Sequence, residues 1–328
     1  MMSKIFGTNN TLALYLIPFF GAMIGVFFHF SGAVESAVVL EHQHLTAYFG
    51  SFVQTAWLQT VVIIVVLIIS AWLITAITAM QDIHEKPNHW SSLLFLLIIT
   101  MNPAILLWNG FVFANLFLLL ALRRILPIYN EAAVNSKVFD AGFLLGVAGF
   151  FQPSYWALII LALITLVVMR PFKWREFAIL GIGFTTPFYA FVFLMYWQDD
   201  FTGLDNLFSM SIYMFDISYL QSQITNGVLY TLLIMSVLMV FSSMRYSTVH
   251  QRKHKQTLIL LAVISLILNT FFGGVHLSQL GGWLCIPIAV LMPFLIQWFK
   301  KESMQNALIF MLVALLILNY LYFPSLAQ

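Results

Sequence analysis

One short segment of the chain gathers residue types that could bind a divalent metal ion. Glu41, His42 and His44 lie within four positions of one another, and carboxylates and imidazoles are both common ligands of divalent metals. A second pair, His250 and His254, has the spacing that places two rings on one helix face. That pair lies in a strongly basic segment, which repels cations. The acidic segment is therefore the better candidate metal site.

Several polar residues interrupt otherwise apolar runs, close to what would be one end of each helix. They are Asn102, Asn109, Asn115, Gln152 and Gln279. A polar side chain surrounded by lipid needs a partner. These residues either line a polar cavity or form hydrogen bonds between helices and to carbonyls freed by prolines. The cavity interpretation assigns the lining to Asn102, Asn109, Gln152 and Trp156.

The composition decides what kind of elements position these residues. Of 328 residues, 62% are hydrophobic and 8% are charged, whereas a soluble domain carries about 25% charged residues. The mean hydropathy is +0.95, which is typical of a chain that lies mostly in a bilayer. A soluble enzyme and a nucleic-acid binder are excluded. The single cysteine, Cys285, excludes a disulfide within the chain.

The apolar runs predict an all-α, polytopic membrane protein with about eleven transmembrane helices. The runs cover 11–30, 53–80, 91–108, 110–122, 138–151, 154–169, 177–197, 223–243, 257–272, 279–298 and 304–323. If the N-terminus is cytoplasmic, all 14 Lys and Arg residues fall on the cytoplasmic side. This segregation follows the positive-inside rule and predicts an inner-membrane protein with its N-terminus inside and its C-terminus outside. A cleaved signal peptide at the first run is disfavoured, because its apolar core exceeds the roughly 7 to 15 residues of such peptides.

The helices expected at 91–108, 110–122, 138–151 and 154–169 are short for membrane spans. A helix rises about 1.5 Å per residue, so 13 residues cover about 20 Å of a hydrocarbon layer about 30 Å thick. Basic residues hold their inner ends at the cytoplasmic surface. The outer turns, at 108–110 and 152–154, should then lie below the outer surface, which predicts a cavity open to the periplasm. The alternatives are helices that extend into their flanks and a locally thinner bilayer.

A central motif carries a resemblance to a known family. The stretch from Phe113 to Leu126, followed by Lys137–Phe143, resembles the signature of an uncharacterised family of polytopic inner-membrane proteins of Bacteroidota, some of which carry a carotene-oxygenase label. The resemblance implies no activity. Within the motif, we expect a structural ion pair between Arg124 and Asp140, because an unpaired acid inside the membrane is costly.

The predicted order of elements also resembles the GT-C class of membrane glycosyltransferases, which use polyprenyl-phosphate-linked sugars. In that class an acid just after the first helix is a general base or metal ligand, which implies this catalytic role for Glu35 or Glu41. The outer face lacks Lys and Arg, so His42, His44 and His276 are the side chains left to hold a lipid phosphate or a metal. The GT-C-like module would cover about 1–243, and the C-terminal helices about 244–328, of a single membrane domain.

Three functions therefore remain open. The first is a GT-C-like protein that handles a polyprenyl-phosphate-linked sugar or another lipid at its periplasmic face. The second is a non-catalytic assembly or scaffold protein that binds membrane lipids and partner membrane proteins. The third is a metal-dependent oxygenase, which requires histidines clustered at one metal.

Overall fold

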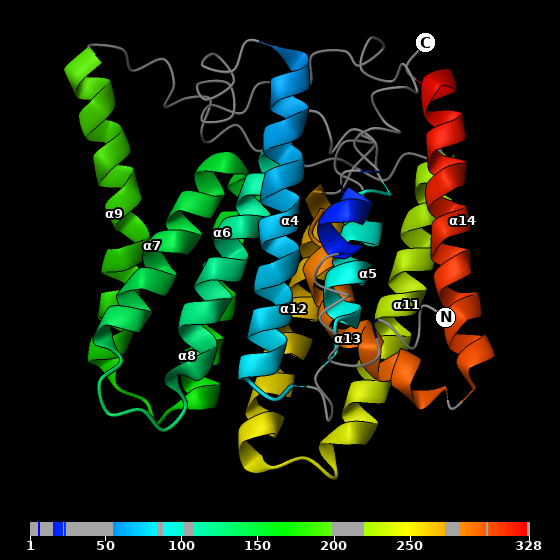
Figure 1. The fold of residues 1–328 in the computed structure, drawn as a ribbon. Helices are drawn as coiled ribbons and strands as arrows, with labels where there is room; N and C mark the ends of the chain where they lie inside the picture. The colour runs from blue at the N-terminus through cyan, green and yellow to red at the C-terminus, as the bar shows by residue number, and fades with distance from the viewer. Residues whose placement is uncertain are drawn as a thin grey trace.

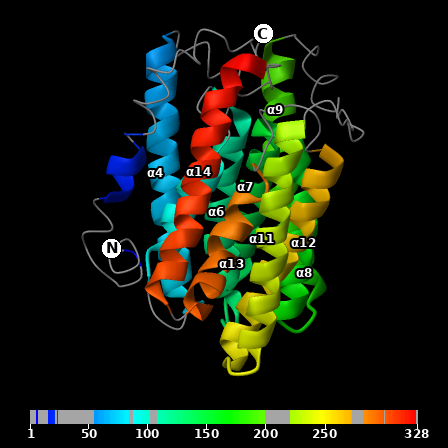
Figure 2. The ribbon, with the colours of Figure 1, turned by 90° about the vertical axis from the view of Figure 1, so that its right-hand side faces the viewer.

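The computed structural model describes residues 6, 16–21, 23, 55–83, 88–101, 108–198, 220–272, 282–299 and 301–326. These residues are helical or in turns, with no strand among them. The helices run roughly along one axis in two perpendicular views (Figure 1, Figure 2). Their bounds are α4 Ala56–Met80, α5 Trp90–Ile99, α6 Gly110–Ile125, η2 Leu126–Ile128, α7 Asn135–Phe151, η3 Pro153–Leu158, α8 Ile159–Met169, α9 Trp174–Gln198, α11 Leu220–Met244, α12 Val249–Phe272, α13 Cys285–Trp298 and α14 Glu302–Leu326.

Every predicted apolar run contains helix where its residues are described, but several helix ends were predicted wrongly. The run predicted at 91–108 holds α5, which ends at Ile99. α6 continues through Arg123 and Arg124 into η2, and α12 begins at Val249 and includes most of the basic segment that was predicted as a loop. Lys and Arg are good helix formers, and their long side chains reach the interface from the last turns of a span. Charged residues therefore end an apolar run without ending the helix.

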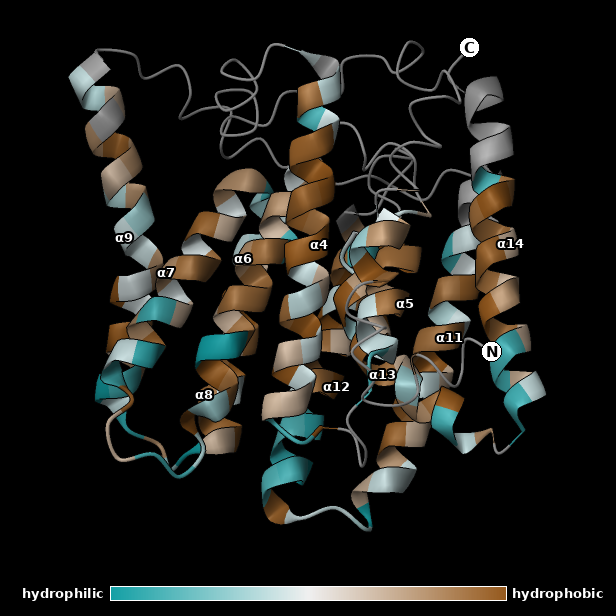
Figure 3. Cartoon of the chain, viewed as in Figure 1, coloured by the Kyte–Doolittle hydropathy of each residue, from teal (hydrophilic) through white to brown (hydrophobic). Residues whose placement is uncertain are grey.

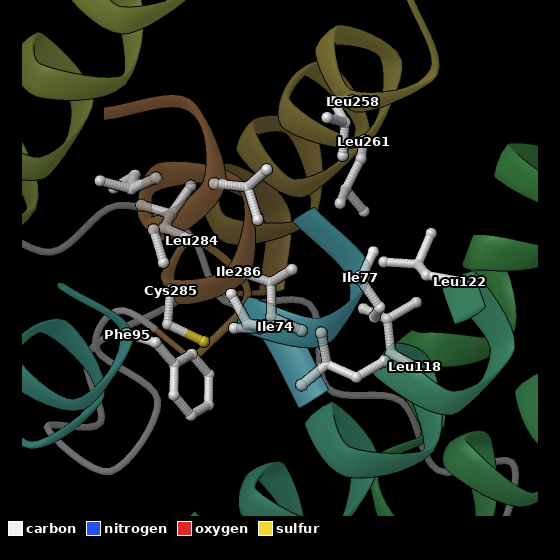
Figure 4. Packing of buried hydrophobic residues seen from close by; sticks show 14 of the residues in the cluster. Ile74, Ile77, Phe95, Leu118, Leu122, Leu258, Leu261, Leu284, Cys285 and Ile286 are labelled. Atoms are coloured by element: carbon white, nitrogen blue, oxygen red, sulfur yellow. The ribbon is translucent and has the colours of Figure 1, made fainter. Parts of the chain in front are cut away.

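Two short helices form the centre of the fold. All ten residues of α5 are buried, as are Cys285 to Ile296 of α13, and these two helices pack against each other. A helix that is apolar on every side is stable only when it is surrounded. Residues of α4, α5, α6, α12 and α13 converge in this core (Figure 4). Because α13 contacts α5 and α11, the C-terminal helices are integrated with the preceding ones.

The longer helices surround this centre and expose apolar side chains. Within the described residues, six helices are long and apolar enough to cross a membrane: those at 57–80, 110–128, 174–197, 225–244, 249–271 and 302–319. The spans of α9 and α14 are the least buried, at 18% and 17%. An apolar surface of this kind suits lipid rather than water. The protein is thus a helical, multi-pass membrane protein.

Glycines bring α7 and α9 into close contact. A Cβ atom built on Gly142 would lie 2.4 Å from the carbonyl oxygen of Leu180, and one on Gly183 would lie 2.4 Å from that of Phe139. Gly146 approaches the carbonyl oxygen of Phe184 in the same way. Helices in membranes commonly associate through small residues that let the backbones approach. These glycines hold α9, which packs mainly on α7, against the rest of the protein.

The two ends of the bundle differ in charge, and at one of them the helices stop at different heights. The described Lys and Arg residues lie at the C-terminal ends of α6, α8 and α11 and at the N-terminal ends of α7, α9, α12 and α14, which we call the basic end (Figure 3). At the opposite, far end, α6 and α7 stop well short of the level that α4, α9 and α14 reach (Figure 1). α6 has 16 residues and α7 has 17, more than predicted, because both extend toward the basic end.

Candidate functional site

The far ends of the short helices hold the polar residues that the sequence singled out. Asn109 caps α6, and its Oδ1 accepts a hydrogen bond from the Phe111 amide at 2.9 Å. Gln152 ends α7 and is buried, and its carbonyl oxygen accepts from the Tyr155 amide at 2.9 Å. Capping of this kind satisfies backbone groups that a helix end leaves unpaired. Both residues therefore shape the turns that begin α6 and end α7.

Next to these turns lies a buried group that we call the tyrosine network: Asn115, Ser154, Tyr155, Gly282 and Trp283. The Tyr155 hydroxyl donates to Asn115 Oδ1 at 2.7 Å, and Asn115 Nδ2 donates to the Gly282 carbonyl at 3.1 Å. Trp283 Nε1 donates to Ser154 Oγ at 3.2 Å. The network joins α6, η3 and the turn before α13. Because its buried groups are paired with one another, it ties these elements together.

An aromatic contact reinforces the same junction. The Phe111 ring meets the Trp283 ring edge to face, with centroids 4.7 Å apart. A Cβ atom on Gly282 would lie 2.6 Å from the Phe111 ring, so a glycine is needed where the turn crosses this ring. The junction between α6 and α13 is therefore closely packed at the far end.

Trp156, predicted to line the cavity, lies between α7 and α9. Its Nε1 donates to the Gly146 carbonyl at 3.3 Å, and its ring lies 4.7 Å from that of Phe188. Gly149 is needed beneath it, because a Cβ there would overlap the indole. The structure thus gives Trp156 a packing role beside the far-end turns. Asn102, the fourth predicted lining residue, lies outside the described residues.

The predicted catalytic and metal-binding residues also lie outside the described ranges. They are Glu35, Glu41, His42, His44 and His276, so their roles stay predictions. Within the ranges that are described, no group of three or more His, Cys, Asp or Glu residues could hold a metal ion. His250 and His254 do meet, with their Nε2 atoms 3.1 Å apart, but this pair supplies two ligands.

A second polar group at the far end was missed by the sequence reasoning. We call it the amide cluster: Thr225, Asn226, Tyr230, Asn269 and Asn319. Asn269 Nδ2 donates to the Tyr230 hydroxyl at 2.6 Å. Thr225 Oγ1 donates to Asn319 Oδ1 at 3.2 Å, and Asn319 Nδ2 donates to the Met101 carbonyl at 3.0 Å. The signal that could have found this cluster is an asparagine near the far end of each of three apolar helices.

At the basic end, two ion pairs bridge neighbouring helices. Arg124 Nε lies 3.5 Å from Asp140 Oδ2, and these side chains are 55% and 35% exposed. Arg170 and Glu176 approach to 3.3 Å with both side chains more than 90% buried. Arg170 also donates to the carbonyls of Ile128 and Glu131. An exposed pair contributes little stability and breaking a buried one is costly, so the Arg170 pair, which the sequence reasoning did not select, is the stronger structural link.

Comparison with known proteins identifies a family. No curated protein and no solved structure shows a significant match to the chain. The model of a family of unknown function, DUF6427, matches residues 9–327, which is nearly the whole chain. The protein therefore belongs to the DUF6427 family.

Proposed function

We propose that the protein binds an amphipathic, lipid-linked substrate at the far end of its helix bundle, with a GT-C-like module at about 1–243 in the bacterial inner membrane. The difference in level between the helices carries this proposal. α6 and α7 end well below α4, α9 and α14 (Figure 1), so their far-end turns lie below the ends of the tall helices, and we place the substrate in this zone. The positive-inside rule makes this far end the periplasmic one.

The lengths of the helices support a recess in that zone. α6 has 16 residues, which cover about 24 Å, less than the roughly 30 Å hydrocarbon layer. With Arg123 and Arg124 at the inner interface, the turn at Asn109 lies below the outer one. Irregular backbone at that depth must be buried in protein or border a watered cavity. The buried tyrosine network lies beside these turns, so it would form the base of the proposed recess.

The proposed chemistry follows from the GT-C resemblance. Glu35 would act as the general base and Glu41 would be the alternative, while His42, His44 and His276 would hold a substrate phosphate or a divalent metal. The substrate class is a polyprenyl-phosphate-linked sugar or a related lipid. A general base is needed for the reaction and not for folding.

Complementation of a deletion strain tests the proposal. Glu35→Gln should abolish function while the protein stays at its normal level in membranes, and Glu41→Gln should retain it. Asp205→Asn is a matched control, because it makes the same carboxylate-to-amide change in a segment that we assign to the outer face. Full complementation by both glutamine variants would reject the catalytic proposal.

A scaffold function is the second candidate, and the tyrosine network favours it. The polar side chains of that network bond to one another and hold three elements together, as in a protein whose far end is built for rigidity. A scaffold would bind lipids or partner membrane proteins without chemistry. Silent Glu35→Gln and Glu41→Gln variants, combined with loss of function when the tyrosine network is disrupted, would support it.

A further inference from the structure

The amide cluster contains two buried oxygen atoms that lack partners. Asn226 and Asn269 are 8% and 3% exposed, and the Oδ1 atom of each is buried without a hydrogen-bond partner. Leaving such a group unpaired costs about 1–3 kcal/mol. The tyrosine network, at the same end, has its oxygen and nitrogen atoms paired. The two far-end polar groups therefore differ in kind, because the amide cluster keeps two buried oxygen atoms unpaired.

The two asparagines lie near the far ends of α11 and α12, which form an antiparallel pair connected at the basic end (Figure 1). Lys255 donates to Ser243 and Ser247, so the basic residues of α12 and the end of α11 share one level at the inner interface. Asn226 precedes Ser243 by 17 residues, and Asn269 follows Lys255 by 14. At 1.5 Å per residue they lie about 26 and 21 Å from that level, in the outer third of a hydrocarbon layer about 30 Å thick. A headgroup bound there would lie in the recess proposed above.

Tyr230 connects the two helices at this point. It lies one helical turn after Asn226, on the same face of α11, and its hydroxyl accepts from Asn269. Exchanging the oxygen and nitrogen of the Asn269 amide would pair Oδ1 with the Tyr230 hydroxyl and leave Nδ2 unpaired instead. Either orientation leaves one polar atom of Asn269 available. The unpaired capacity is thus a property of the site, whichever way the amide is oriented.

The chemistry of these atoms selects the ligand. Amide oxygens need hydrogen-bond donors, and a neutral hydroxyl provides one without the cost of burying a charge. Hydroxyl groups also accept, so they suit an amide in either orientation. We propose that Asn226 and Asn269 bind hydroxyl groups of a lipid-linked sugar whose headgroup enters between α11 and α12. This inference rests on the proposed function for its substrate class and adds the site that recognises the sugar.

Lipid binding in nanodiscs tests the site. Protein is reconstituted in phosphatidylethanolamine and phosphatidylglycerol with either monoglucosyl diacylglycerol or sugar-free diacylglycerol, and retained lipid is measured by native mass spectrometry. Wild type should retain the glucolipid in preference to diacylglycerol. Asn226→Leu and Asn269→Leu should each weaken glucolipid retention about three- to tenfold, since each removes one hydrogen-bonding group. Asn306→Leu is the matched control, because it removes a similarly unpaired amide oxygen near the basic end of α14.

Thermal unfolding distinguishes ligand binding from a role in folding. Competition with free glucose distinguishes a lipid-linked sugar from a soluble one. Asn226→Leu should leave the thermal midpoint of the lipid-free protein unchanged or raised, because the amide oxygen it removes bonds to nothing in the fold. A lowered midpoint, equal retention by all variants, or equal retention of both lipids would overturn the site. Competition by free glucose without glucolipid retention would assign the site to a soluble sugar and overturn the lipid-linked assignment.

The outcome is separable from that of the catalytic proposal. Asp205→Asn, the control of the complementation experiment, should bind the glucolipid normally, because it changes no residue of the amide cluster. If Glu35→Gln is silent in complementation while Asn226→Leu loses the glucolipid, catalysis is rejected and the sugar site stands.

Discussion

The contact between α7 and α9 gives the sharpest quantitative prediction. In Gly183→Ala, the new Cβ would lie 2.4 Å from the Phe139 carbonyl oxygen, whereas carbon and oxygen in close helix contacts stand about 3.3 Å apart. The helices would have to separate by roughly 0.9 Å at this point. The neighbouring atom belongs to the backbone, so no rotamer change relieves the clash.

The loss of stability in Gly183→Ala can be compared with the effect of a control substitution on the same helix. Overpacking costs about 1–3 kcal/mol, whereas alanine stabilises a helix by about 0.5–1 kcal/mol relative to glycine. A Cβ on Gly181 meets nothing within 4 Å, so Gly181→Ala shows the propensity gain alone. Gly183→Ala should therefore be about 1–3 kcal/mol less stable than Gly181→Ala.

Equilibrium unfolding of both variants in mixed detergent and SDS measures this difference. Because α9 packs mainly on α7, Gly183→Ala should also expose α9 to proteolysis at lower SDS than Gly181→Ala does. Equal stability of the two variants would refute the close packing of α7 against α9.

Three further predictions concern the basic end and the orientation. Arg170→Met should lower the free energy of unfolding by about 3–5 kcal/mol because it leaves the Glu176 carboxylate buried and unpaired. The double variant with Glu176→Met should recover most of this loss. Equilibrium unfolding of the wild type, the two single variants and the double variant measures the coupling. Burial lowers the pKa of His89 below its ordinary value of 6.5. Its contribution to the free energy of unfolding should therefore be complete above pH 6.5 and fall as the pH drops, by at most about 1.4 kcal/mol per pH unit. His89→Gln should reduce this dependence of the free energy of unfolding on pH, and an unchanged dependence contradicts the assignment. Impermeant thiol reagents added from the periplasmic side should label Asp205→Cys and not Arg252→Cys, and the reverse pattern would invert the orientation.

The sequence alone was sufficient for the class of fold. The apolar runs correspond to helices because transfer of side chains into lipid depends on residue type and local spacing, and a helix is the local way to satisfy its backbone there. The described Lys and Arg residues collect at one end for a similar reason, since each must reach an interface. Helix ends were less predictable. α12 starts inside the basic segment because Lys and Arg are compatible with both helix and interface.

The pairing of polar groups was decided by tertiary structure. Asn115 and Gln152 could be recognised as polar residues in apolar runs, but the partners Tyr155 and Gly282 come from other elements. Arg124 and Asp140 could be paired from sequence because one short connection separates their helices. Nothing local distinguished the buried pair of Arg170 and Glu176 from that exposed pair, because burial depends on which helices pack over a residue.

The same physics separates the two polar groups at the far end. Sequence determined that asparagines lie near the ends of α6, α11, α12 and α14. Only packing decided that Asn115 meets the Tyr155 hydroxyl, whereas Asn226 of α11 and Asn269 of α12 keep amide oxygens unpaired. A hydrogen bond requires two groups within about 3 Å and correct alignment, and positions far apart in the chain reach that geometry only when the whole bundle is assembled.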